Sequence, residues 1–157
     1  VLDEYKDIIA DLALLRIEGY LKRNKNSNEL IIKKRVYFLN YLKSIYLYNN
    51  KTRFIYTDEI IQHIGNLTGE IIKEQYFRQQ IIGPLRTEGL LISSNSKGYK
   101  IPCSTSDIYA FFNLSSRIIH PMLKRLKKTH DALLQATNGE LNVLSNAEFD
   151  YLKKMMD

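Results

Sequence analysis

The hydrophobic and polar positions of the first fifty residues follow a pattern that is typical of two helices. Residues 2–22 repeat apolar side chains close to the helical period, and acidic residues in the first turn suit the positive end of the helix dipole. Residues 30–49 repeat the pattern, with an apolar stripe that consists of Ile32, Val36, Leu39, Leu42 and Leu47. The polar stretch 23–29 predicts a linker between an appended helix and the main domain.

Residues 50–69 combine a short β pattern with a helix. The run 53–56, after the Asn49-Asn50 turn, is typical of a short strand. Thr57 is expected to cap the next helix, because acidic residues follow it in the first turn, and Gly65 is expected to end that helix.

Residues 70–102 predict a helix followed by a hairpin. The helix is expected over about residues 70–88, starting at Glu70 or Glu74, with Gly89 as its left-handed cap. We expect a kink or break at Gly83-Pro84, because proline lacks the amide and clashes with the preceding turn. Two short apolar segments flank an Asn/Ser/Lys/Gly turn, which indicates a β-hairpin over residues 90–102.

The segment after the hairpin predicts one long helix. Ser104 and Asp107 resemble a capping box, and the apolar period continues over residues 105–136. Pro121 lies inside this range and is expected to bend the helix.

Together these elements predict a fold that is mainly α with a small β-hairpin (α+β). A short last helix is expected over residues 145–155, capped by Ser145. We expect three parts: an N-terminal helix and linker (1–29), a main domain (30–103), and a long packing or dimerisation helix with a short C-terminal helix (104–157). The first part could be the end of a missing domain.

The excess of positive charge lies in the middle of the chain. Residues 1–29 hold five Lys/Arg against six Asp/Glu, residues 30–134 hold sixteen against seven, and residues 135–157 hold two against four. A basic surface attracts polyanions through phosphate neutralisation and counterion release. Acidic membranes or acidic proteins use the same kind of surface, so the charge alone does not separate these partners.

The residues that usually carry catalysis are few and scattered. Cys103 is the only cysteine and has no accompanying His/Asn or His/Asp pattern, so we expect a buried or half-buried thiol. His63, His120 and His130 lack the spacing of a metal site, and the glycines are scattered and form no phosphate-binding loop. The Glu-x-Lys pair at Glu4 and Lys6 sits at a helix start and is interpreted as dipole-matching charge. We therefore expect no enzyme activity, no catalytic residue, no metal and no cofactor.

Composition also bounds the location of the protein. No stretch of about 18 residues is free of charge, so no membrane span is expected. A single cysteine fits a reducing compartment, and we expect a cytoplasmic protein. Because the first residue is Val1 and not Met, we expect the natural chain to be processed or trimmed at its start.

One run of the sequence carries a family pattern: Arg78-x-x-Ile81-x-x-x-Leu85-Arg86-x-x-Gly89-x-x-Ile92-Ser93-Ser94-x-x-x-Gly98-Tyr99-x-Ile101. The order of elements from residue 30 is helix, short strand, helix, turn, helix and hairpin. Over about residues 30–103 the sequence resembles the winged helix-turn-helix DNA-binding superfamily. The helix over 105–136 looks like the dimerising or packing helix that many such regulators append. The resemblance implies a winged helix-turn-helix with flanking helices that binds double-stranded DNA.

The candidate DNA-binding residues follow from the physics of this arrangement. The helix over 70–88 has an apolar side and a polar side, and the major groove admits one α-helix whose Arg and Gln side chains pair with guanine and adenine edges. Hydroxyls near helix starts hold phosphates, and short polar or basic side chains on a hairpin contact the backbone or the minor groove. The candidates are Thr57, Thr68, Lys73, Gln75, Tyr76, Arg78, Gln79, Asn95, Ser96, Lys97 and Lys100. Arg78 and Gln79 are expected to select bases, whereas Lys97 and Lys100 are expected to add affinity for the backbone.

Two functions from different classes remain open. The first is double-stranded DNA binding, either as a transcriptional regulator or as the DNA-recognition part of a larger protein. The alternative is a non-catalytic protein–protein interaction or assembly module built on a winged-helix scaffold. A possible homodimer would use the 105–136 helix, although apolar stripes such as that of Phe111, Phe112, Ile119, Leu126 and Leu133 more often pack within their own chain. A continuous positive surface over 73–79 and 95–100 would favour DNA.

Overall fold

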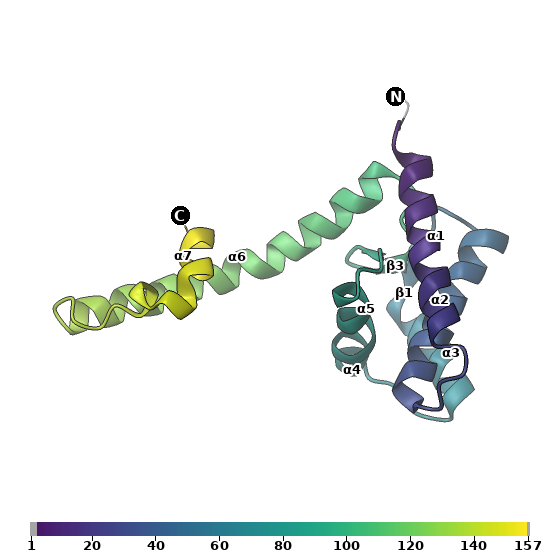
Figure 1. The fold of residues 1–157 in the computed structure, drawn as a ribbon, viewed down its shortest axis with the longest axis horizontal. Helices are drawn as coiled ribbons and strands as arrows, with labels where there is room; N and C mark the ends of the chain where they lie inside the picture. The colour runs from purple at the N-terminus through teal and green to yellow at the C-terminus, as the bar shows by residue number, and fades with distance from the viewer. Residues whose placement is uncertain (1–2, 157) are drawn as a thin grey trace. The chain divides into compact units, whose positions relative to one another are not determined.

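The protein is mainly α-helical with a small antiparallel sheet, as the sequence predicts (Figure 1). The structure is a computed structural model that describes residues 3–156. The chain divides into two compact units, one up to Phe112 and one from Asn113. The helix α6 (Thr105–Ala136) begins in the first unit and continues into the second.

Two long helices form one side of the first unit. Helix α1 (Lys6–Arg23) starts four residues later than the periodicity indicates, and α2 (Leu30–Tyr48) starts where it was expected. The α1 side chains Ala13, Ile17 and Tyr20 are fully buried in the same core as α2. The first helix therefore packs as part of this unit, beside α2 (Figure 1).

Helix α3 (Thr57–Thr68) follows the short strand β1 (Ile55–Tyr56) directly. The expectation that Gly65 ends this helix is wrong, because the helix continues to Thr68 and ends at Gly69. Gly69 has φ 73°, the left-handed conformation that a glycine adopts without steric cost. Thr57 is the first helical residue and not the cap, and its amide donates a hydrogen bond to the carbonyl of Lys97 at 3.3 Å.

The next helical stretch runs from Glu74 to Thr87 and contains a π-helical turn. It consists of α4 (Glu74–Phe77), the π-turn η1 (Arg78–Ile82) and α5 (Gly83–Thr87), and residues 70–73 lie outside it. The break expected at Gly83-Pro84 is thus replaced by a wider turn just before the proline. Because Pro84 has no amide to offer, the carbonyl of Gln80 accepts a hydrogen bond from Arg35 Nε at 2.9 Å instead.

The sheet consists of β1 and the two strands of a hairpin, β2 (Ser93–Ser94) and β3 (Gly98–Lys100). All pairs are antiparallel and the strand order is β1-β3-β2, with Tyr99 opposite both Ile55 and Ser94. The Asn95 side chain accepts hydrogen bonds from the amides of Lys97 and Gly98, which closes the hairpin turn. The predicted hairpin over 90–102 is therefore present, with shorter strands than expected.

The centre of the first unit is a cluster of three aromatic rings. Phe38, Phe77 and Tyr99 come from α2, α4 and β3, and their rings meet edge to face with centroids 5.3–6.5 Å apart. Such pairs add to the free energy of burial and fix the angle at which rings meet. The cluster therefore links the helix at 74–87 to both the sheet and α2.

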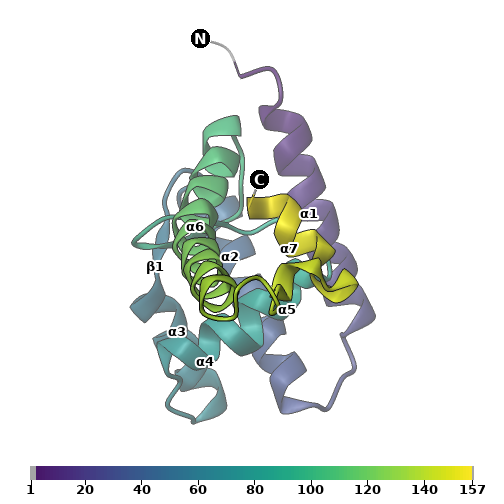
Figure 2. The same ribbon diagram turned by 90° about the vertical axis from the view of Figure 1, so that its left-hand side faces the viewer.

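The second unit consists of most of α6 and the C-terminal segment. After the turn at Asn138 and Gly139 come two 3-10 turns, η2 (Val143–Ser145) and η3 (Ala147–Phe149), and the helix α7 (Asp150–Met156). Asn146, not Ser145 as expected, accepts the capping hydrogen bond, from the amide of Glu148. Helix α7 lies beside the last turns of α6 (Figure 2). Side chains of both helices and of the two 3-10 turns line a cavity of about 140 Å³.

Candidate nucleic-acid interface

The helical stretch from Glu74 to Thr87 is two-sided. Its apolar residues Phe77, Ile81, Ile82 and Leu85 are buried, as the sequence predicts. The candidate side chains Gln75, Arg78 and Gln79 are exposed, and Lys73 is exposed just before the helix begins. This face is free of core packing and presents two amides and two cations.

Arg78 forms an exposed ion pair and can exchange the partner carboxylate for another acceptor. Its Nη1 lies 2.8 Å from Glu74 Oε1, one helical turn earlier, and both side chains are more than half exposed. Exposed ion pairs of this kind contribute at most about 1 kcal/mol. The guanidinium can therefore leave the carboxylate for a better acceptor at small cost.

Tyr76 is less accessible than the neighbouring candidates. Its ring is half-buried, and its hydroxyl accepts a hydrogen bond from Lys34 Nζ at 3.0 Å. The same ammonium lies 2.5 Å from Glu70 Oε2. Lys34 is thus tied to an internal network, which holds Tyr76 at the edge of the exposed face.

The two threonine candidates differ in their positions. Thr57 lies at the first turn of α3, next to the hairpin, and its amide donates to the Lys97 carbonyl. Thr68 was placed near a helix start, but it is the last residue of α3, and its hydroxyl donates to the carbonyl of Ile64 at 2.9 Å. The negative end of the helix dipole is unfavourable for a phosphate, so Thr68 does not fit the role expected for it.

The hairpin tip presents one cation. Ser96 and Lys97 are exposed, whereas Asn95 is half-buried and its side-chain oxygen is occupied by the turn. The hydrogen bond from Thr57 to the Lys97 carbonyl brings the tip against the start of α3. The structure therefore places Thr57 and Lys97 side by side.

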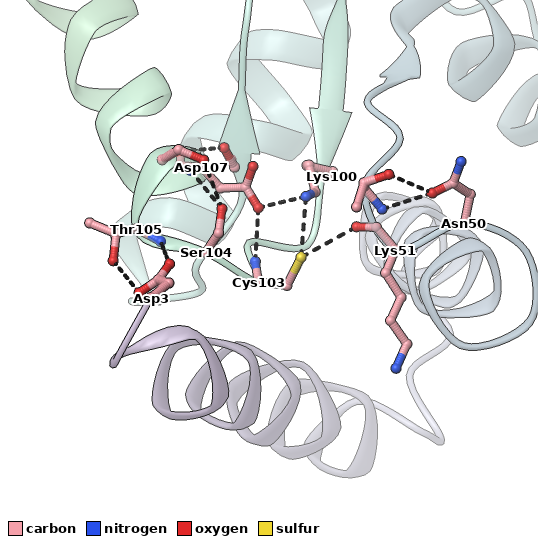
Figure 3. A network of polar contacts seen from close by, with 11 residues as sticks. Asp3, Asn50, Lys51, Lys100, Cys103, Ser104, Thr105 and Asp107 are labelled. Atoms are coloured by element: carbon pink, nitrogen blue, oxygen red, sulfur yellow. Dashed lines mark hydrogen bonds and ion pairs between the residues drawn. The ribbon is translucent and has the colours of Figure 1, made fainter. Parts of the chain in front are cut away.

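Lys100 does not lie on the surface as expected. Only 4% of it is exposed, and its Nζ lies 2.5 Å from Asp107 Oδ2, in the first turn of α6 (Figure 3). Its ammonium also donates to Cys103 Sγ at 3.4 Å. The side chain is committed to this buried ion pair, so it cannot reach a phosphate without breaking the pair.

Asp107 is the centre of a network that sequence reasoning missed (Figure 3). Its carboxylate accepts from the Cys103 amide at 2.9 Å, and its own amide donates to Ser104 Oγ, which is the predicted capping contact. The hydroxyl of Ser93 in β2 donates to the Asp107 carbonyl at 2.6 Å. Both strands of the hairpin are therefore attached to the first turn of α6. The only sequence signal for this network was the pattern Ser104-x-x-Asp107, which follows a strand that contains Lys100.

A second acid anchors the beginning of the chain to the same helix start. Asp3 accepts hydrogen bonds from the amide and the hydroxyl of Thr105, at 2.6 and 2.7 Å. The bond from the Thr105 amide is the main reason that the pKa of Asp3 is lowered. The sequence suggested only that Asp3 matches the dipole of its own helix.

Ion pairing reduces the positive charge that remains available. Of the basic residues in 30–112, five pair with acids: Lys34, Lys43, Arg53, Arg78 and Lys100. Only in the Arg78 pair are both side chains more than half exposed. The exposed cations at the candidate interface are Lys73, Arg78 and Lys97. Residues 113–134 add five Lys/Arg against one acid, so part of the basic excess lies on α6 in the second unit.

The class that the fold defines is a mainly α-helical protein with a three-stranded antiparallel sheet. Comparison with family models, curated proteins and solved structures finds no match to this chain. Among residues 3–156, no cluster of His, Cys, Asp or Glu is arranged to hold a metal ion. Within the same range, none of the helices combines the length and the apolar composition that crossing a bilayer requires.

Proposed function

We propose that this protein binds double-stranded DNA in the manner of a winged helix-turn-helix. In this proposal the helical stretch 74–87 enters the major groove and the hairpin over 90–102 contacts the flanking backbone. The protein acts as a transcriptional regulator or as the DNA-recognition part of a larger protein.

The observation that carries the proposal is the exposed side of the 74–87 helix. Gln75, Arg78 and Gln79 project from a helix whose opposite side is anchored by Phe77 in the aromatic cluster. Arg pairs bidentately with guanine edges and Gln with adenine edges, so these side chains suit base readout. Because the opposite side of the helix is packed in the core, these three side chains are positioned without further ordering of the helix.

The order of the elements supports the same proposal. Helix α3, the turn 69–73 and the 74–87 helix precede the hairpin, and the strand order β1-β3-β2 puts the hairpin beside β1. The hydrogen bond from the Thr57 amide to the Lys97 carbonyl puts a hydroxyl-bearing residue and a basic residue close together at the hairpin tip. Both groups are suited to neighbouring phosphates.

The proposed interface consists of the candidates whose side chains are accessible. Base contacts come from Gln75, Arg78 and Gln79, and backbone contacts from Thr57, Lys73, Ser96 and Lys97. Asn95 supports the hairpin turn and Tyr76 borders the base-reading face. Thr68 and Lys100 are left out because their side chains are engaged internally.

Duplex binding is expected to weaken steeply with salt. Each phosphate that the protein neutralises contributes about −0.9 to the slope of log K against log salt. With Lys73 and Lys97 as the cations that contact the backbone, we expect a slope of about −2. Fluorescence anisotropy of a labelled duplex at increasing salt measures it, and an affinity that does not change with salt would contradict the proposal.

A second candidate function, self-association, is favoured by the apolar side of α6. Ile119, Met122 and Leu126 follow the alternating three- and four-residue spacing of a two-stranded coiled coil, and Leu133 lies one heptad after Leu126. All four side chains are exposed. Leu126 and Leu133 also line the cavity against α7, so packing within the chain covers part of this stripe. We propose that a second copy of the chain packs along Ile119 and Met122, which gives a two-fold dimer that contacts two half-sites.

Replacing Ile119 by glutamate is expected to abolish dimer formation, because it places two like charges opposite each other in an apolar seam. Sedimentation velocity at increasing protein concentration measures the association. Lys124→Glu, on the opposite side of α6, is the matched control and should leave the dimer intact. A wild-type protein that stays monomeric at high micromolar concentration, with and without DNA, would argue against the dimer.

A further inference from the structure

A cavity of about 290 Å³ lies in the first unit between α5, the segment leading into β2, and the first turns of α6. Its lining is almost entirely apolar. The main side chains are Leu90, Leu91, Ile92, Pro102, Ile108, Phe111 and Phe112. None of the proposed DNA contacts lines it, so it is separate from the interface described above.

Among the residues that the structure describes, Arg86 is the single charged side chain in this lining. Its Nη2 donates to the Ile92 carbonyl at 2.7 Å and to Ser94 Oγ at 3.0 Å, and its Nε also donates to Ile92. The guanidinium carbon lies 4.1 Å from the centroid of the Phe111 ring. These contacts hold the cation in a defined orientation at the cavity.

The charge of Arg86 has no negative partner among residues 3–156. The ion pairs in that range do not include it, and its hydrogen bonds go to a carbonyl and a hydroxyl through Nε and Nη2. Burial lowers the pKa of Arg86 to about 10, which reflects the cost of keeping an unpaired cation away from water. Buried charges are normally paired, so a site of this kind favours an anion.

We propose that this cavity binds a small monocarboxylic acid with an apolar body. The carboxylate pairs with the Arg86 guanidinium, and the apolar body lies against Phe111, Ile108 and Leu91. A cavity of this size is at the lower end of the range for small-molecule sites, of about 300–1,000 Å³, so the ligand is small. Inorganic anions such as phosphate gain little from such a lining, because they have no apolar surface to bury.

The site joins two elements of the proposed DNA interface. Arg86 belongs to α5, at the end of the 74–87 helix, and its hydrogen bonds end on the strand that leads into the hairpin. Ligand binding itself does not depend on DNA. The inference therefore goes beyond the proposed function, and it is tested in the absence of DNA.

The test uses 3-phenylpropionate as the probe and 3-phenylpropionamide as its neutral isostere, on the full chain without DNA. Titration followed by amide chemical shifts is expected to show saturable shifts at Leu91, Ile92, Ile108 and Phe111. 3-Phenylpropionamide should bind at least about tenfold more weakly than the acid, because it lacks the charged group that hydrogen-bonds to Arg86. Equal binding of acid and amide, or no binding up to about 10 mM, would overturn the proposal.

Two variants test whether binding of the acid requires Arg86 itself or only a positive charge nearby. Arg86→Gln should weaken binding of the acid to the level of the amide, whereas Arg16→Gln should not change it. Arg16 donates to the carbonyl of Gly89 next to the cavity but does not line it, so it is the matched control. If Arg86→Gln does not fold, Ile108→Phe keeps the cation and fills the cavity, and it should abolish binding of both probes. If either Arg86→Gln or Ile108→Phe folds and binds the acid as tightly as the wild-type protein, the proposal is overturned. Loss of DNA binding by Arg78→Ala would not affect the proposal, because Arg78 does not line the cavity.

Discussion

Replacing Asp107 by alanine is expected to lower the free energy of unfolding by about 3–5 kcal/mol. The substitution leaves the Lys100 ammonium, which is 4% exposed, without its partner, and it removes the acceptor for the Cys103 amide. An uncompensated buried charge is costly, because the surrounding protein replaces little of its hydration. Urea denaturation followed by circular dichroism measures the loss.

Two controls separate the buried charge from other effects. Replacing both members, Lys100→Met with Asp107→Leu, should restore much of the stability, because no charge is then left unpaired. Glu74→Ala breaks the exposed pair with Arg78 and is expected to cost less than about 1 kcal/mol. A similar small loss for Asp107→Ala would mean that water or another group reaches Lys100.

Replacing Arg78 by alanine is expected to cost about 1–3 kcal/mol on the preferred duplex and to relax the preference among bases. The first half of the helix enters the groove in helix-turn-helix docking, and Arg78 lies there on the exposed side. Lys97→Ala, at the hairpin tip, should instead weaken all duplexes alike and reduce the salt slope by about 1. Binding of both variants to matched specific and random duplexes decides between these roles.

Thr87→Ala is the matched control for these variants. Thr87 is exposed at the far end of the same helical stretch, and its hydroxyl is bonded to the carbonyl of Gly83. Its substitution should change neither affinity nor base preference. Equal losses on specific and random duplexes for Arg78→Ala would show that base readout lies elsewhere, and Lys73 would then be the next residue to test.

The sequence was a good guide where periodicity and local turn chemistry decide the structure. The buried side of the 74–87 helix, the hairpin and the limits of α6 were all predicted, because each follows from side-chain spacing within one segment. The stripe of α2 was only partly right. Leu39 and Leu42 are buried, but Leu47 is exposed and Phe38, which was not in the stripe, lies at the centre of the core.

The sequence was a poor guide where backbone conformation or a contact between distant segments decides the structure. Gly65 and Gly69 are equally plausible helix ends by composition, and only the backbone conformation selects Gly69. Lys100 has the composition of a surface residue, and its burial depends on the position of Asp107. The contact that removes Tyr76 from the free surface is of the same kind, since it joins α2 to α4. Thr68 was misplaced for a local reason, because its role depended on where α3 ends.

The π-turn at Arg78–Ile82 changes the phase of the helix. In a regular α-helix each residue advances by about 100°, so Arg86, seven residues after Gln79, would project in almost the same direction as Gln79. The extra residue of the π-turn shifts everything after it by about one such step. Arg86 is consequently turned away from the direction of Gln79, and its Nη2 donates hydrogen bonds to the Ile92 carbonyl and to Ser94 Oγ. One inserted residue therefore keeps Gln79 and Arg86, two residues of a single helical stretch, from projecting on the same side.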